Sequence, residues 1–305
     1  SGVAGIPRDL VRPQRDEVTT SALVSLADRR TLAISVSGPD GGVPLVFHHG
    51  TPGCRIQSSA LARACHDHGL RLVTYDRAGA GDSTRHPGRL IADVAADVNA
   101  LLDHLRADRC LTAGKSGGGP HALATAALLP DRVAAVASLA GVAPFEDGFL
   151  DGMGQDNLDE FAAALAGEAV LRPYLAQHQA VLAEADAAGM VSQLASLLPD
   201  VDRAVLTDEA GADLVANLRG GVRSIDGWLD DDLAFTQHWG FELESISVPT
   251  YVWQGGADLM VPAHHGERLA AAIPASTAHL INGEGHFSIV LGRLDQIVGE
   301  LAQHL

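Results

Sequence analysis

The chain has 305 residues, of which 47% are hydrophobic, and its formal net charge is −17. This size and apolar content allow a large α/β core with an insertion, whereas the acidic balance argues against binding to nucleic acid or to an anionic membrane surface. The three cysteines, Cys54, Cys65 and Cys110, form no CxxC pair, so we expect no disulfide framework, no zinc site and a reducing compartment.

The sequence predicts an N-terminal extension at residues 1–21. The segment is polar and lacks the apolar stretch of a signal peptide. No run of about 18 apolar residues occurs in the sequence, so no transmembrane helix is expected. Together these features favour a cytoplasmic protein, with its oligomeric state left open.

Residues 22–144 predict the first part of an α/β core. Alternating apolar positions at 22–37 favour a β-hairpin. Further strands are expected at 44–47, 70–75, 110–113 and 133–139, and helices at 55–68, from 91 to 105 and from the turn at 114–118 to Pro130. Such alternation indicates a mostly parallel central sheet with helices on both faces.

Residues 145–240 interrupt this rhythm and predict a helical cap. Helical stretches at 158–166, 174–187 and 202–219 occur without a convincing strand, and the segment is acidic, with three consecutive aspartates at 230–232. The α/β pattern returns at 241–305, where strands are expected at 250–254 and 278–281 and helices at 262–273 and 287–301. The predicted core therefore comprises 22–144 and 241–305.

Gly114-Lys115-Ser116-Gly117-Gly118 matches the pattern G-x-S-x-G and lies between an apolar strand and a helix. A sharp turn in that context raises a serine hydroxyl above the sheet edge, which makes Ser116 the candidate nucleophile. A phosphate-binding loop would need glycine at position 109, which is Arg109. A glycine-rich turn with a capping serine is the remaining alternative.

A serine nucleophile requires a base, and His286 is the candidate. It ends a Gly-x-Gly-His loop between the last strand and the last helix, at the sheet edge that carries Ser116. His48 and His49 also follow a strand and are the alternative bases.

Asp258 is the candidate acid that would accept the Nδ1 hydrogen of His286. It follows the strand at 250–254, and the order Ser, Asp, His is that of α/β hydrolases. Its alternative role is a turn or helix cap before Pro262, and Glu146 or Asp147 would then supply the acid.

A tetrahedral intermediate needs two preset hydrogen-bond donors. The N–H of Gly117, next to the nucleophile, is one candidate. The second should come from the loop at 49–53, where Pro52 has no N–H. We therefore predict the N–H of Thr51, with Gly53 as the alternative.

These residues resemble the α/β-hydrolase superfamily over 22–305. The resemblance rests on His-Gly-x-Pro-Gly at 49–53, Asp-Arg-x-Gly-x-Gly-x-Ser at 76–83, and the serine turn with its later aspartate and histidine. It is closest to proline-iminopeptidase-like hydrolases and related esterases. It implies the α/β-hydrolase fold, a lid at 145–240, no metal and no organic cofactor, and Ser116, Asp258 and His286 as the triad.

Two departures from the iminopeptidases concern the site. Gly50-Thr51 stands where they have Gly-Gly after the histidine, and Gly118 stands where they carry Trp. The resemblance thus extends to the hydrolase core rather than to peptidase activity. Asp76 and Arg77 are expected to brace the loops beneath the site.

The predicted reaction is hydrolysis of a carboxylic ester, thioester, lactone or amide through an acyl-enzyme. The alternatives are an iminopeptidase-like aminopeptidase and a non-hydrolytic member of the fold, either a lyase or cyclase or a ligand-binding protein. Lys115, the single lysine, and His49 are candidate substrate contacts. Lys115 would suit an anionic substrate and the acidic cap a cationic one, so the substrate charge stays open.

Overall fold

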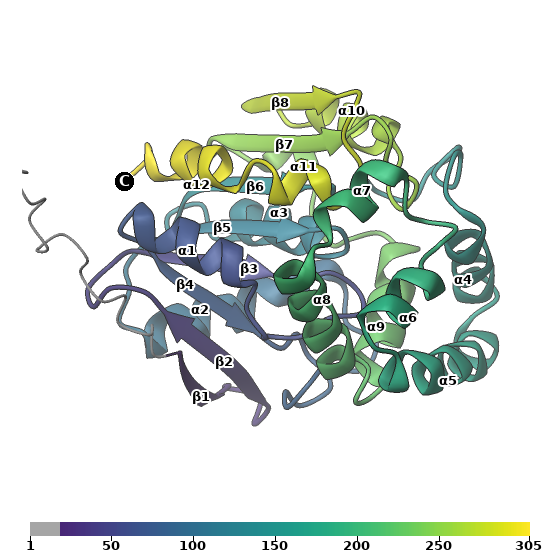
Figure 1. Ribbon diagram of the computed structural model, residues 1–305. Helices are drawn as coiled ribbons and strands as arrows, with labels where there is room; N and C mark the ends of the chain where they lie inside the picture. The colour runs from purple at the N-terminus through teal and green to yellow at the C-terminus, as the bar shows by residue number, and fades with distance from the viewer. Residues whose placement is uncertain (1–18) are drawn as a thin grey trace, which may run out of the picture.

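A computed structural model describes residues 19–305, and an eight-stranded sheet forms its centre (Figure 1). The strands are β1 (Thr20–Ser25), β2 (Thr31–Ser37), β3 (Pro44–His48), β4 (Arg71–Tyr75), β5 (Cys110–Lys115), β6 (Val133–Leu139), β7 (Thr250–Gly255) and β8 (Ser276–Ile281). Their order is β1-β2-β4-β3-β5-β6-β7-β8, and only the pairings of β2 are antiparallel. The mostly parallel sheet predicted from the sequence is confirmed.

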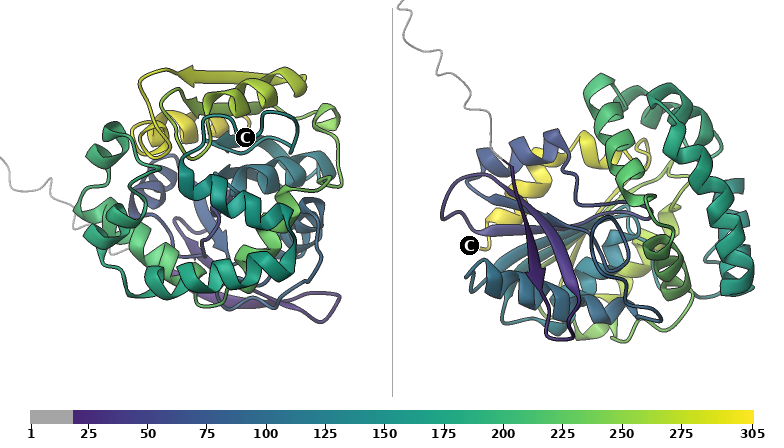
Figure 2. Two further views of the ribbon diagram at one scale, coloured as in Figure 1. Left: turned by 90° about the vertical axis from the view of Figure 1, so that its right-hand side faces the viewer. Right: turned by 90° about the horizontal axis from the view of Figure 1, so that it is seen from below.

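Helices cover both faces of the sheet because each contributes one apolar side to the core (Figure 2). One face packs against α2 (Val94–His104), α3 (Gly118–Leu128) and α10 (Ala263–Ala272), and the other against α1 (Ser59–Asp67), α11 (Ser288–Leu291) and α12 (Leu294–Ala302). The short turns η1 (Ile91–Asp93) and η2 (Leu243–Ser245) complete the core.

Three boundaries of the predicted core differ from those observed. The helix expected at 55–68 begins only at Ser59, because the Ser58 hydroxyl accepts the hydrogen bond that caps it. The last helix is interrupted at Gly292 and Arg293, which separate α11 from α12. Strand β1 begins within the predicted extension, and residues 1–18 lie outside the described residues.

Six helices lie between β6 and β7, and we call them the cap. They are α4 (Gln155–Leu165), α5 (Glu168–Glu184), α6 (Ala187–Gln193), α7 (Asp200–Val205), α8 (Asp208–Gly221) and α9 (Asp226–Phe235). The right-hand view of Figure 2 shows them beyond one end of the strands. Helices α6 and α9 were not predicted. The helix predicted at 202–219 is two helices, because Leu206 and Thr207 leave the helical conformation.

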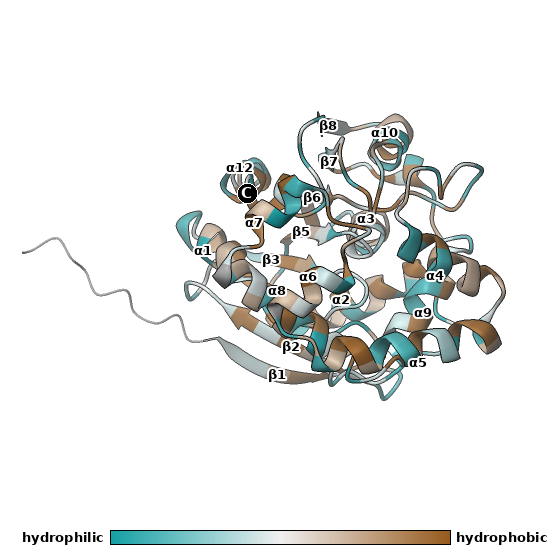
Figure 3. Ribbon diagram, turned by 45° about the vertical axis from the view of Figure 1, so that its right-hand side comes forward, coloured by the Kyte–Doolittle hydropathy of each residue, from teal (hydrophilic) through white to brown (hydrophobic). Residues whose placement is uncertain are grey.

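The cap has a small apolar core of its own, to which Leu171, Leu175 and Trp228 belong. Figure 3 shows helices α4 and α5 carrying both hydrophobic and hydrophilic residues, as helices with one buried face do. Within residues 19–305, no helix combines the length and the apolar character needed to cross a membrane.

The carboxyl ends of the parallel strands face the cap, as the arrows of β5, β7 and β8 show in Figure 1. Loops that leave these ends are the usual position of binding sites in α/β proteins. The predicted site residues lie on the loops after β3, β5, β7 and β8. The sheet therefore brings segments that are far apart in sequence to one edge.

Candidate active site

Ser116 lies at the sharp turn between β5 and α3. Its φ is +55°, in the left-handed region that residues with a side chain rarely adopt, and its N–H donates to the carbonyl of Leu139 at 2.9 Å. The turn requires glycine at Gly114, where a Cβ would lie 2.0 Å from the carbonyl oxygen of Gly118. Strain of this kind is typical of a nucleophile turn.

The structure brings His286 and Asp258 together. Nδ1 of His286 lies 2.8 Å from Oδ2 of Asp258, and both side chains are buried. The backbone N–H groups of Met260 and Val261 donate to Oδ1 of Asp258, each at 2.8 Å. These two bonds fix the orientation of the carboxyl group, and an acid in this position holds a histidine with its proton on Nδ1.

The alternative bases occupy other positions. Both ring nitrogens of His48 face hydroxyl groups in the core. Nδ1 of His49 donates to the carbonyl of the next residue at 2.7 Å, and its Nε2 accepts the N–H of Arg77 at 3.1 Å. Burial and the charge of Arg77 lower the pKa of His49 to about 3. His49 therefore orders its own loop and has no ring nitrogen left for a substrate.

The alternative acids, Glu146 and Asp147, are exposed on the loop after β6. Asp258, by contrast, is 3% exposed and bonded to His286. The structure therefore brings the candidate base His286 into contact with Asp258 and not with the alternative acids.

The two predicted oxyanion donors are neighbours. A Cβ built on Gly117 would lie 2.5 Å from Oγ1 of Thr51, and one built on Gly50 would lie 3.6 Å from Cβ of Ser116. The loop at 49–53 therefore runs beside the nucleophile. Gly53, the alternative donor, is turned toward Asn217 of helix α8.

Arg77 braces the loop at 49–53, which we call the oxyanion loop after its predicted role, and the sequence predicted this bracing. Its guanidinium donates to the carbonyls of His49 and Gly50 at 2.6 and 3.2 Å and to Oγ1 of Thr51 at 3.0 Å. Asp231, from cap helix α9, accepts from Arg77 and also from Oγ1 of Thr51 at 2.6 Å. The cap and the core thus meet at Thr51.

Asp231 is charge-balanced although it is only 2% exposed. Burial opposes ionisation, but Arg77 and Arg89 hold the pKa of Asp231 well below its usual range. Sequence reasoning missed this residue. The only signal was the run of aspartates at 230–232, which reads as a solvated acidic patch, and all three are buried.

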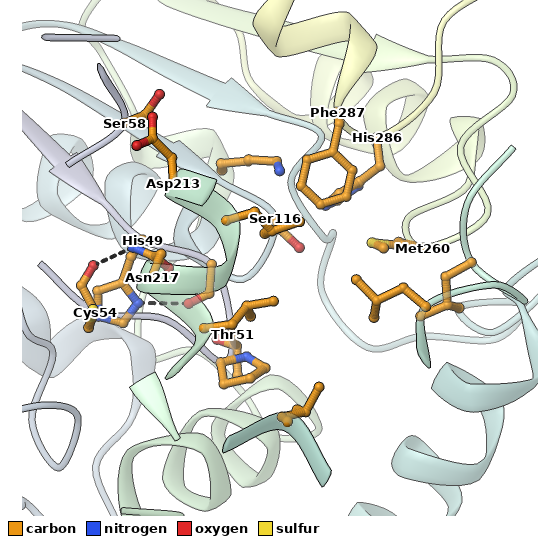
Figure 4. A pocket seen from close by; sticks show the side chains of 18 of the residues that line it. His49, Thr51, Cys54, Ser58, Ser116, Asp213, Asn217, Met260, His286 and Phe287 are labelled. Atoms are coloured by element: carbon orange, nitrogen blue, oxygen red, sulfur yellow. Dashed lines mark hydrogen bonds between the residues drawn. The ribbon is translucent and has the colours of Figure 1, made fainter. Parts of the chain in front are cut away.

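A cavity of about 330 Å³ lies between the cap and the core, within the roughly 300–1,000 Å³ that small-molecule sites span. Ser116 and His286 both line it, and Figure 4 shows Ser116 between the Thr51 loop and the pair His286 and Phe287. Apolar side chains form much of the wall, among them Leu61, Leu197, Leu214, Leu218, Val290 and Leu294.

Lys115 lines the same cavity beside the nucleophile. Its Nζ lies 3.4 Å from the centre of the Phe287 ring, a cation–π distance. Burial lowers the pKa of Lys115 to about 7, against the opposing charges of Asp202 and Asp258. Lys115 is thus a candidate substrate contact whose pKa depends on its burial in the site and on its neighbouring carboxylates.

Glu160 of the cap lines the cavity, and its carboxyl group forms a buried pair with that of Asp232. Nε1 of Trp228 donates to Oε1 of Glu160 at 2.7 Å, and Asp232 is a buried neighbour. Burial raises the pKa of both Glu160 and Asp232, and their mutual repulsion raises that of Asp232 further. Such a pair retains a proton that an isolated, exposed pair would lose.

The described residues 19–305 contain no group of three or more His, Cys, Asp or Glu side chains arranged to hold a metal ion.

A family model described as the alpha/beta hydrolase fold matches residues 43–292. The chain belongs to the α/β-hydrolase family. The matched range includes the serine turn, the oxyanion loop, the cap, Asp258 and His286.

Curated relatives of this α/β hydrolase carry several activities. It is 28% identical to the sn-1-specific diacylglycerol lipase of Mus musculus over 93% of this chain and 89% of the lipase. It is 27% identical to the proline iminopeptidase of Neisseria gonorrhoeae over 82% of this chain and 84% of that enzyme. A non-heme chloroperoxidase of Streptomyces lividans is 34% identical, but over only 47% of this chain and 54% of that protein.

Proposed function

We propose that this α/β hydrolase is a serine hydrolase that cleaves a carboxylic ester, thioester, lactone or amide bond of a small molecule through an acyl-enzyme. The observation that carries the proposal is the buried pair of His286 and Asp258, which shares a cavity with Ser116 at its positive-φ turn. This combination has the parts needed to activate a hydroxyl group.

In the first step, the Ser116 hydroxyl attacks the substrate carbonyl while Nε2 of His286 takes its proton. Asp258 accepts the Nδ1 hydrogen, holds the tautomer and stabilises the imidazolium. The negative charge on the carbonyl oxygen is held by the N–H groups of Gly117 and Thr51. His286 then gives its proton to the leaving group, and an acyl-enzyme remains.

In the second step, His286 removes a proton from a water molecule that attacks the acyl-enzyme. The same two N–H groups hold the second tetrahedral intermediate. Collapse returns the proton to Ser116 and releases the acid. No further group is required for the proton balance of either step.

The cavity wall favours an ester with an apolar acyl or alcohol part. Leucines from α1, α8 and α12 line one side, so a hydrocarbon group would displace water from an apolar surface. The likeness to a relative described as a diacylglycerol lipase supports ester chemistry.

An iminopeptidase-like activity is the second candidate, because Asp156 and Glu160 of the cap line the cavity and could face a substrate amine. The likeness to the neisserial proline iminopeptidase supports it. The hydrogen bond from Trp228 weakens it, since Oε1 of Glu160 is already engaged within the cap. A chain-length series of p-nitrophenyl esters, compared with prolyl-p-nitroanilide, separates these substrates.

The decisive test is intact-mass spectrometry after treatment with a fluorophosphonate. A single adduct is expected on the wild type, and none on Ser116→Ala or His286→Ala. Ester turnover should fall on the order of 10⁶-fold in Ser116→Ala. An unlabelled wild type would favour a ligand-binding role, and full turnover by Ser116→Ala would favour a lyase or cyclase.

A further inference from the structure

The loop that carries His286 is held by a side chain from the cap. Asp202 lies on α7, which contacts α11 just after the histidine loop (Figure 1). Its carboxylate is completely buried. Oδ2 accepts the N–H of His286 at 2.7 Å, and Oδ1 accepts the N–H groups of Phe287 and Ser288 at 2.8 Å each. One carboxylate therefore fixes three consecutive peptide groups.

The local sequence is adapted to this contact. A Cβ built on Gly285 would lie 2.5 Å from Oδ2 of Asp202, so any larger residue would displace the carboxylate. The three N–H groups precede or begin α11, where a helix has no internal acceptors for them. Charge-assisted bonds from a carboxylate to backbone N–H groups are among the stronger hydrogen bonds.

The hydrogen bonds that the Asp202 carboxylate accepts within residues 19–305 all come from the histidine loop, and its charge also acts on Lys115. Asp202 is not among the residues that line the cavity. The backbone of His286 thus has its N–H fixed by Asp202 while its side chain is fixed by Asp258. Loss of the first constraint would let the imidazole move as a unit with its peptide, and small displacements of a base are costly in rate.

We propose that Asp202 is a positioning residue of the acyl-transfer reaction, through which the cap holds His286 in line with Ser116. This inference rests on the proposed function, because it requires His286 to be the base. In consequence the cap is part of the catalytic framework as well as a cover: a core without α7 would keep the triad side chains but not their alignment.

The first test compares Asp202→Asn with Asp200→Asn. Both remove one negative charge from α7, but Asp200 is fully exposed, and among the described residues its carboxylate bonds only to Arg203, three residues away. In Asp202→Asn, an NH₂ group, which cannot accept a hydrogen bond, replaces one of the two oxygens that accept from the backbone N–H groups. We expect kcat and the rate of fluorophosphonate labelling to fall at least about tenfold in Asp202→Asn, with KM changed less than about threefold. Asp200→Asn should match the wild type.

A second variant, Gly285→Ala, displaces the carboxylate while keeping its charge, and should lower the labelling rate in the same direction. The deshielded proton on Nδ1 of His286, followed by ¹H NMR, should shift or broaden in both variants and not in Asp200→Asn. A purely structural role would lower the melting temperature of Asp202→Asn and leave these two signals unchanged below it.

Wild-type labelling and turnover by folded Asp202→Asn would overturn the inference. If Asp202→Asn does not fold, normal labelling and an unchanged Nδ1 resonance in Gly285→Ala would overturn it instead. Failure of the proposed function has a different signature, since the wild type itself would then not be labelled.

Discussion

Two core loops form the candidate site, and the cap holds each with a buried carboxylate in a different way. On the oxyanion side, Asp231 pairs with Arg77 and Arg89 and accepts from Thr51. On the histidine side, Asp202 binds three backbone N–H groups and no arginine in the described part of the chain.

The two contacts should therefore affect different properties. The contact of Asp231 should mainly affect the free energy of unfolding, and that of Asp202 the alignment of His286. Removing one member of a buried ion-pair network leaves uncompensated charge and costs about 3–5 kcal/mol. Asp202→Asn keeps one oxygen, which can still accept the N–H groups of Phe287 and Ser288, and leaves one neutral donor unsatisfied at a cost of about 1–3 kcal/mol. We therefore expect the oxyanion side to dominate the free energy of unfolding and the histidine side to dominate the rate.

The largest expected effect is that of Asp231→Asn on stability. The variant leaves Arg77 and Arg89 buried without their anion, so the free energy of unfolding should fall by about 3–5 kcal/mol. Urea denaturation followed by circular dichroism measures it, with Asp200→Asn as the control for charge alone. A loss below about 1 kcal/mol would show that the two arginines find other partners, and the comparison would fail.

A smaller change on the same side is Thr51→Val. Valine keeps the backbone N–H that is proposed to hold the oxyanion but removes the hydroxyl that joins Asp231 to the loop. We expect kcat to fall about tenfold, since loss of one complete oxyanion donor costs about 10²–10³. Steady-state kinetics with Thr51→Ser, which keeps the hydroxyl, provide the control. Equal rates for the two variants would remove any role for this hydroxyl bridge.

The smallest effect concerns Lys115 on the histidine side. Its pKa is lowered to about 7 in the folded protein, so between that pH and its ordinary value near 10.5 the unfolded chain binds more protons. Wild-type stability should therefore rise from pH 7 to 9 relative to Lys115→Met, and the two should run parallel below pH 6. Asp202, Asp258 and the Phe287 ring face the amine, and the first two limit the shift.

Urea denaturation of both proteins at pH 6, 7, 8 and 9 gives their free energies of unfolding. The difference between the two values reports on Lys115 alone, because every other titrating group is present in both proteins. A constant difference would mean that the amine stays fully charged in the cavity. In that case Lys115 would be available as a permanent cation for an anionic substrate.

The serine turn and its partners were predictable from local patterns. Ser116 could be found because G-x-S-x-G between a strand and a helix is a tight local structure, and His286 and Asp258 because each follows a parallel strand. Parallel strands place their carboxyl ends at one edge, so chain order was enough to bring the three together. Most of the elements that differ lie in the cap, where α6 and α9 were missed and 202–219 was expected to be one helix. In the core, the last helix is divided into α11 and α12.

The sequence by itself determined the α/β core, its sheet and the positions of the serine, histidine and acid, because these depend on hydrophobic periodicity and on short turn motifs. Only the tertiary structure decided that Asp202 and Asp231 would be buried against the two loops of the candidate site. An acidic residue on a helix has the same local pattern whether it meets water or a backbone N–H. Its role depends on how the cap packs against the core. That packing is set by contacts between residues far apart in sequence, such as Asp202 and His286, which are 84 positions apart.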